Sequence, residues 1–192
     1  MRVAFVGGTH HVGPVTVPLL LEAGHEVVVA HSGAHEHPAV AAVEHLHGPR
    51  DELLAEGGPI ERWAPEVLID TFAPGATADK GGALAACARR SGAAQIVAVS
   101  SMDVYQHCVH AGIADGTGVI PLPPQRLPLY EDAPLRDKPY PVGSPEHDNV
   151  AMEARSVLQP ASQSCVRARS TAPTSTPGSA TSSSSSGTEY AS

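Results

Sequence analysis

Residues 2–13 read RVAFVGGTHHVG, a short apolar run that passes directly into a glycine-rich turn. The apolar run is typical of a strand that is buried on both faces of a sheet. Apolar residues then recur at helical spacing as far as Gly24, and residues 26–30, EVVVA, form a second apolar run. This order of strand, turn, helix and strand predicts one βαβ unit with a right-handed crossover.

The chain continues this alternation of strands and helices beyond the first unit. Residues 66–70 (EVLID) and 95–100 (QIVAVS) fit strands, and an alanine-rich helix is expected over residues 76–90 between them. Residues 43–47 fit another strand, although residues 38–46 fit a short helix equally well. Alternating strands and helices predict an α/β fold with a mostly parallel, doubly wound sheet.

The C-terminal part has a different composition. A Pro- and Gly-rich excursion over residues 112–145 is followed by an amphipathic stretch at residues 145–158. In residues 170–192, 14 of 23 residues are Ser or Thr, which predicts disorder because little apolar surface offsets the entropy of ordering. We therefore divide the chain into a domain at residues 1–158 and a low-complexity Ser/Thr/Pro-rich tail at residues 159–192. From this abrupt change we expect a truncated or frameshifted chain.

Composition excludes several classes of protein. The chain has 12 Lys+Arg against 20 Asp+Glu and a net charge of −8, which argues against a nucleic-acid binder with a broad cationic face. Its three cysteines form no CxxC pair, so neither a disulfide scaffold nor a cysteine zinc cluster is expected. No apolar run approaches 18 residues and the N-terminus does not fit a signal peptide. We expect a cytoplasmic protein without membrane contact.

The glycine-rich turn has the chemistry of a phosphate site. Glycine lets the backbone approach a pyrophosphate closely, and the following helix N-terminus supplies N–H groups and a positive dipole end. His10 and His11 lie inside this turn, where either fits a phosphate contact or merely fills the turn. The alternative to a nucleotide site is a glycine turn without a ligand.

Histidine is unusually frequent, with 11 copies. The pairs His35-x-His37 and His45-x-His47 resemble metal ligands, because alternate residues of a strand share one face. A metal site also requires convergence in space, which the sequence does not show. Exposed substitutions in a variable region explain the pairs more simply, so no metal site is assigned.

Four segments carry a family resemblance. They are GGTHHVG at residues 7–13, LID at 68–70, VSSMDVY at 99–105 and EDAPLR at 131–136. In this order they resemble the extended short-chain dehydrogenase/reductases, and more narrowly the NAD-dependent epimerase/dehydratase group. The resemblance implies a Rossmann-like fold with an incomplete substrate domain, because extended members place that domain after the catalytic helix. It also implies NAD or NADP as cofactor, a small-molecule substrate such as a nucleotide sugar, and a homodimer.

The resemblance also implies roles for individual residues. The catalytic Ser/Thr that hydrogen-bonds the reacting oxygen matches Ser101. The pyrophosphate is expected over the glycine turn, and the segment after the strand at 66–70 is expected beside the adenosine. The residues implied at the cofactor are Gly7, Gly8, Thr9, His10, Gly13, Arg50, Asp70, Phe72, Ala73 and Ser100.

The chain departs from the family at its catalytic pair. The family uses a Tyr and a Lys four residues later, and no YxxxK occurs anywhere in this sequence. Counting back four residues from Glu153, where the family has its lysine, gives Asn149, and four more give Pro145. We therefore expect an oxidoreductase fold with impaired catalysis. A non-catalytic nucleotide-binding or sensor protein, or a fragment without independent function, is the alternative.

Cofactor choice stays open at this stage. An acidic residue at the end of the second strand would favour NAD, and an arginine there would favour NADP. Residues 31–33 read HSG and supply neither. The family's Gly-Asp-Arg after the third strand appears as GPR at residues 48–50, which removes one adenine contact. NAD and NADP are therefore equally compatible with the sequence.

Overall fold

Five parallel strands form one sheet in a computed structural model of the chain. The structure describes residues 1–71, 76–101, 104–106, 130, 132–136 and 148–156. In spatial order the strands are β3 (Glu44–His47), β2 (Glu26–His31), β1 (Arg2–Val6), β4 (Val67–Asp70) and β5 (Gln95–Ala98). Every neighbouring pair is parallel. The order 3-2-1-4-5 is that of a Rossmann-like doubly wound sheet, which confirms the expected α/β fold.

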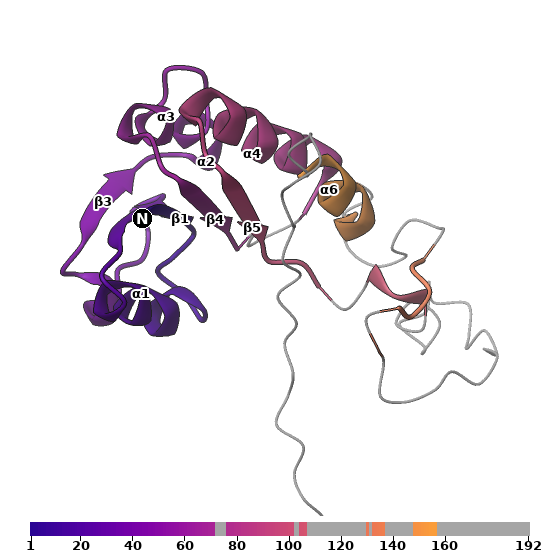
Figure 1. Cartoon of the computed structure of the whole chain (residues 1–192), viewed down its shortest axis with the longest axis horizontal. Coiled ribbons are helices and arrows are strands. Elements are labelled where there is room, and N and C mark those ends of the chain that lie inside the picture. Colours follow the sequence, from indigo (N-terminus) through magenta and orange to yellow (C-terminus); the bar gives the residue numbers. More distant parts are fainter. Residues whose placement is uncertain (72–75, 102–103, 107–129, 131, 137–147, 157–192) are drawn as a thin grey trace, which may run out of the picture.

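Helices cover both faces of this sheet (Figure 1). They are α1 (Gly13–Glu22), the 3₁₀ turn η1 (Pro38–Val40), α2 (Arg50–Leu53), α3 (Pro59–Trp63), α4 (Ala78–Ser91) and α6 (Asn149–Arg155). Helix α1 and η1 lie on one face, whereas α3 and α4 lie on the other with α6 packed on α4. The structure makes the ambiguous stretch at 38–46 a 3₁₀ turn followed by a strand. The short helices α2 and α3 were not predicted.

Alternate residues of the strands enter two separate cores. In β1, Val3 and Phe5 pack with Val17 of α1 on one face of the sheet. Ala4 of the same strand packs with Leu84 of α4 on the opposite face. Both faces are buried, which is why the strand sequences are continuous apolar runs rather than alternating ones. Among the described residues, no helix combines the length and apolarity needed to cross a membrane.

The C-terminal segment of the domain is described only in part. The structure places α6 at Asn149–Arg155, inside the amphipathic stretch expected at residues 145–158. Most of the excursion at residues 112–145 and the whole tail at residues 159–192 lie outside the described residues. The division at residue 158 therefore stays a prediction.

Helix α6 contacts α4 at a glycine. A Cβ atom placed on Gly81 would lie 2.5 Å from the carbonyl oxygen of Met152, which is closer than any side chain tolerates. A Cβ atom on the next residue, Gly82, would meet nothing within 4 Å. The absence of a side chain at Gly81 is therefore what allows the two helices to approach each other.

The two neighbouring glycines provide a matched test of this packing. Gly81→Ala should lower the free energy of unfolding by about 1–3 kcal/mol, because the added methyl group overpacks the α4–α6 contact. Gly82→Ala should raise it by about 0.5–1 kcal/mol, because alanine is the better helix former at an open position. Urea denaturation followed by circular dichroism measures both. Equal effects of the two substitutions would contradict the packing described.

Candidate cofactor-binding site

The glycine turn between β1 and α1 accepts no side chains at two of its positions. Gly7 has a φ of +78°, and a Cβ atom on it would lie 2.4 Å from Oγ1 of Thr71. A Cβ atom on Gly13 would lie only 1.9 Å from the carbonyl oxygen of Gly8. The N–H of Gly7 donates to the carbonyl of Ala30 at 2.9 Å, which fixes the turn to β2. The start of α1 is thereby held against the end of β1.

The first turn of α1 suits an anion. The residue before the helix, Val12, makes no side-chain cap, and no acidic residue occupies the first turn of this described stretch. Pro14 follows at the start of the helix, where its missing N–H costs nothing. Helix α1 therefore presents the positive end of its dipole to the turn.

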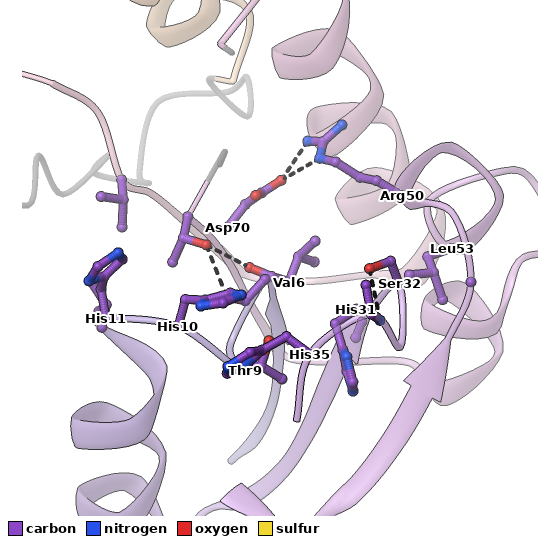
Figure 2. A pocket seen from close by; sticks show the side chains of 17 residues that line it. Val6, Thr9, His10, His11, His31, Ser32, His35, Arg50, Leu53 and Asp70 are labelled. Carbon is purple, nitrogen blue, oxygen red and sulfur yellow. Dashed lines mark hydrogen bonds and ion pairs between the residues drawn. The ribbon is translucent and has the colours of Figure 1, made fainter. Parts of the chain in front are cut away.

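A cavity of about 610 Å³ opens beside this turn (Figure 2). The turn, the segment after β2, and the ends of β4 and β5 line it, together with part of α2. Strand β1 pairs with β2 on one side and with β4 on the other, so the strand order reverses here. Ligands of doubly wound folds bind outside the carboxyl ends of strands at such a point, and the volume suits a bound organic molecule.

An ion pair between Arg50 and Asp70 forms one wall of the cavity (Figure 2). The Nη2 and Nε atoms of Arg50 lie 2.5 Å and 3.2 Å from Oδ2 of Asp70. Nη2 also donates to the carbonyl of Lys80 at 3.2 Å. The side chain of Asp70 is 2% exposed and that of Arg50 is 19% exposed. Arg50, predicted at the cofactor, therefore reaches the cavity while it neutralises a buried carboxylate.

The remaining predicted cofactor residues fall into three groups. Gly7, Thr9, His10 and Asp70 line the cavity, and Gly8 and Gly13 shape the turn beside it. Phe72 and Ala73 lie outside the described residues. Ser100 is not among the described residues that line the cavity, and its buried Oγ has no hydrogen-bond partner in the described structure.

Ser101, the predicted catalytic residue, lies in an exposed position after β5. Its carbonyl accepts a hydrogen bond from the N–H of Val104 at 3.3 Å. Ser101 does not line the cavity in the described part of the chain, whereas Val99, two residues earlier, does. The expected catalytic role stays a prediction.

Two of the family-like segments meet in space, together with the start of α6. The N–H of Arg136, in the EDAPLR segment, donates to the carbonyl of Val104 at 2.8 Å. Nη2 of the same arginine donates to Oδ1 of Asp148 at 3.0 Å, and Asp148 caps α6 by accepting from Ala151. The segment after β5, the EDAPLR segment and the start of α6 are therefore joined by hydrogen bonds.

Helix α6 carries no catalytic pair. Asn149 and Glu153 are both buried, at 4% and 8% exposure. An amide neither accepts nor releases a proton near neutral pH, and a carboxylate at the lysine position has the wrong charge to lower the pKa of a phenol. Asn149 and Glu153 therefore do not have the chemistry of a Tyr and Lys pair.

Sequence analysis missed several residues of the cavity wall. Thr71 lies directly after β4, and its Oγ1 donates toward the carbonyls of Val6 and Gly7, both at 3.3 Å. His35 stacks on His10 with ring centroids 3.9 Å apart. His31 is 7% exposed, and this burial lowers its pKa below the usual range. Only their position in the sequence could have indicated these residues, since each lies at or shortly after the carboxyl end of a strand.

Another buried group is chemically inert. Cys87 of α4 is fully buried in the core. Burial raises the pKa of its thiol to about 11. The thiolate is the reactive form of cysteine, so Cys87 packs as a small apolar residue rather than acting as a nucleophile.

Several solved structures have a fold similar to that of this chain. One is the Bordetella bronchiseptica enzyme WbmG, solved with NAD and UDP, which matches with a TM-score of 0.60 at 18% sequence identity. The match covers 87% of this chain and 52% of WbmG. TunA, an NAD-dependent NDP-hexosamine 5,6-dehydratase, matches with a TM-score of 0.56 at 21% identity, covering 80% and 48%. The chain has their fold.

A further match is UDP-glucose 4-epimerase from Bifidobacterium longum, solved with NAD+ and UDP. Its TM-score is 0.56 at 16% sequence identity, and the match covers 80% of this chain and 47% of the epimerase. The chain spans about half the length of the solved structures it matches. No protein-family model matches the sequence, and neither does any curated protein. The similar structures include an NAD-dependent dehydratase and an epimerase, as the resemblance in sequence led us to expect.

The buried ion pair gives the site a direct test. Asp70→Asn should lower the free energy of unfolding by about 3 kcal/mol, because it leaves the Arg50 guanidinium buried without its countercharge. The double substitution Asp70→Asn, Arg50→Met should recover most of this loss. Glu26→Gln, which breaks the exposed pair between Arg2 and Glu26, serves as control and should cost less than about 1 kcal/mol. Similar losses for the Asp70 and Glu26 variants in urea titrations would contradict the assignment.

Proposed function

We propose that this chain binds a nicotinamide dinucleotide, NAD or NADP, in the cavity at the carboxyl ends of β1 and β4. The observation that carries the proposal is the turn at Gly7, Gly8 and Gly13, which leads into the uncapped start of α1 beside this cavity. Close backbone approach and a helix dipole together suit a pyrophosphate.

The cavity wall supports a placement for each part of the cofactor. The pyrophosphate would lie over the turn, within reach of Thr9 and His10. The adenosine would lie toward His31, at the end of β2, and Ser32, which both line the cavity. The nicotinamide would lie toward the end of β5, where Val99 lines the cavity. The NAD found in WbmG and in the B. longum epimerase, two proteins of this fold, supports the choice of ligand.

The proposed activity is cofactor binding with impaired hydride transfer. A nicotinamide cofactor would supply the hydride acceptor, but this chain lacks the Tyr and Lys that move the substrate's proton in the family it resembles. Asn149 and Glu153 in α6 do not replace them. If a substrate binds, UDP in the similar structures supports a nucleotide sugar. A non-catalytic sensor of the cofactor is the second candidate, because the absence of the Tyr and Lys would impair catalysis and leave the glycine turn intact.

Fluorescence titration of the full chain with NADH and NADPH tests the proposal. We expect saturable binding of at least one of them with one site per chain. His10→Glu should weaken this binding by about tenfold or more, because it places a negative charge at the turn where the pyrophosphate would lie. His10 is exposed, so the substitution should leave the fold intact.

His25→Glu makes the same change of charge at the far end of α1 and serves as the matched control. It should leave the dissociation constant within about threefold of the parent value. No binding of either nucleotide at millimolar concentration would contradict the proposed function. Equal weakening by the two variants would contradict the placement of the pyrophosphate.

A further inference from the structure

Four side chains with metal-binding chemistry converge beside β2 and β3. They are His31 at the end of β2, His45 and His47 of β3, and Glu36 in the segment between the strands. The parallel register pairs His31 with His47, and His45 shares the face of His47 because it is two residues away. One ligand atom from each of the four lies within 4.8 Å of all the others.

Several separations within the cluster are close to those of a tetrahedral site. Nδ1 of His45 lies 2.8 Å from Nε2 of His31 and 3.2 Å from a carboxylate oxygen of Glu36. Nε2 of His47 and Nε2 of His31 lie 3.1 Å and 3.6 Å from the other carboxylate oxygen. Ligands about 2.0–2.1 Å from a central zinc ion would lie about 3.3 Å apart at tetrahedral angles. These four distances bracket this value, and all four ligand atoms lie within 4.8 Å of one another.

A backbone carbonyl orients the His45 ring for metal binding. Nε2 of His45 lies 2.9 Å from the carbonyl oxygen of Val40, an acceptor, so the proton of the neutral ring belongs on Nε2. Nδ1 then directs its lone pair at the cluster. A backbone carbonyl on the outer nitrogen is the usual partner of a metal-bound histidine, because it fixes both the ring and its tautomer.

His31 needs a rearrangement before it can bind. Its Nδ1 accepts from the N–H of Gly33 at 3.2 Å, so the proton of the neutral ring is on Nε2, the atom that faces the cluster. Binding through Nε2 requires that this proton leave, that Nδ1 take one up, and that the Gly33 contact open. Nε2 of His47 donates to a carboxylate oxygen of Glu36 at 3.1 Å, so its proton must also leave before Nε2 binds a metal, whereas His45 and Glu36 need no such change.

We propose that this histidine cluster binds one divalent transition-metal ion of the zinc class. Nδ1 of His45, Nε2 of His47 and a carboxylate oxygen of Glu36 are the principal ligands, and Nε2 of His31 completes the tetrahedron. Three imidazole nitrogens favour zinc over magnesium or calcium, which prefer oxygen ligands. Glu36 and His47 are about half exposed, which gives the ion a path from solvent.

The position of the cluster gives the ion a structural role. Two strands and the segment between them contribute ligands, and four protein ligands leave no open position for a substrate. His31 also lines the cofactor cavity. The ion would therefore fix the end of β2 where the adenosine is proposed to lie, although the metal site does not depend on cofactor binding.

Calorimetric titration of the metal-free full chain with Zn²⁺ tests the proposal, together with visible absorption spectra after addition of Co²⁺. We expect one Zn²⁺ per chain and the intense visible absorption of tetrahedral cobalt. His47→Gln should weaken Zn²⁺ binding by more than about 100-fold, because removal of a direct ligand should exceed the 10–100-fold losses seen for outer partners. His47 is half exposed, so its replacement should leave the fold intact.

The matched control is His37→Gln, which changes the residue next to Glu36 but leaves the cluster complete. It should bind Zn²⁺ within about threefold of the parent chain, and circular dichroism should show the same fold for both variants. No binding at micromolar Zn²⁺, or equal losses in the two variants, would overturn the proposal. The four side chains would then be a hydrogen-bonded cluster without an ion.

Discussion

The contact between Gly13 and the carbonyl of Gly8 is the constraint on which the site depends. A Cβ atom at Gly13 would lie 1.9 Å from that oxygen, so only glycine lets α1 begin directly beside the end of β1. This beginning sets Val17 of α1 into the core on one face of the sheet. It also brings the positive end of the helix dipole to the edge of the cavity.

The sheet places everything else around that contact. Because β1 lies between β2 and β4, the carboxyl ends of these strands share one edge. His31 at the end of β2 lies on one side, and Asp70 at the end of β4 lies on the other with Thr71 after it. The buried pair of Arg50 and Asp70 then closes the wall beneath the proposed cofactor. The ion pair that stabilises the domain therefore lies at the same edge as the proposed cofactor site, and α6 carries Asn149 and Glu153 rather than a Tyr and a Lys.

Periodicity was enough to predict the parallel strands and the longer helices, because both faces of the sheet and one stripe of each helix are apolar. The four- and five-residue helices α2 and α3 span too few turns to show a period. The pairing of Arg50 with Asp70 joins residues 20 positions apart and depends on the register of the sheet. His45 and His47 were recognised as a pair, but their meeting with Glu36 and His31 required the third dimension.

The most direct test of cofactor binding at this edge is a map of backbone amide chemical shifts of the full chain with and without NAD+. The largest changes should fall on residues 7–13, on His31 and Ser32, and on Asp70 and Thr71. No residue of α3 is among the described residues that line the cavity, so the amide shifts of α3 should not change. Changes confined to other regions, or none at saturating NAD+, would contradict a dinucleotide site at the glycine turn.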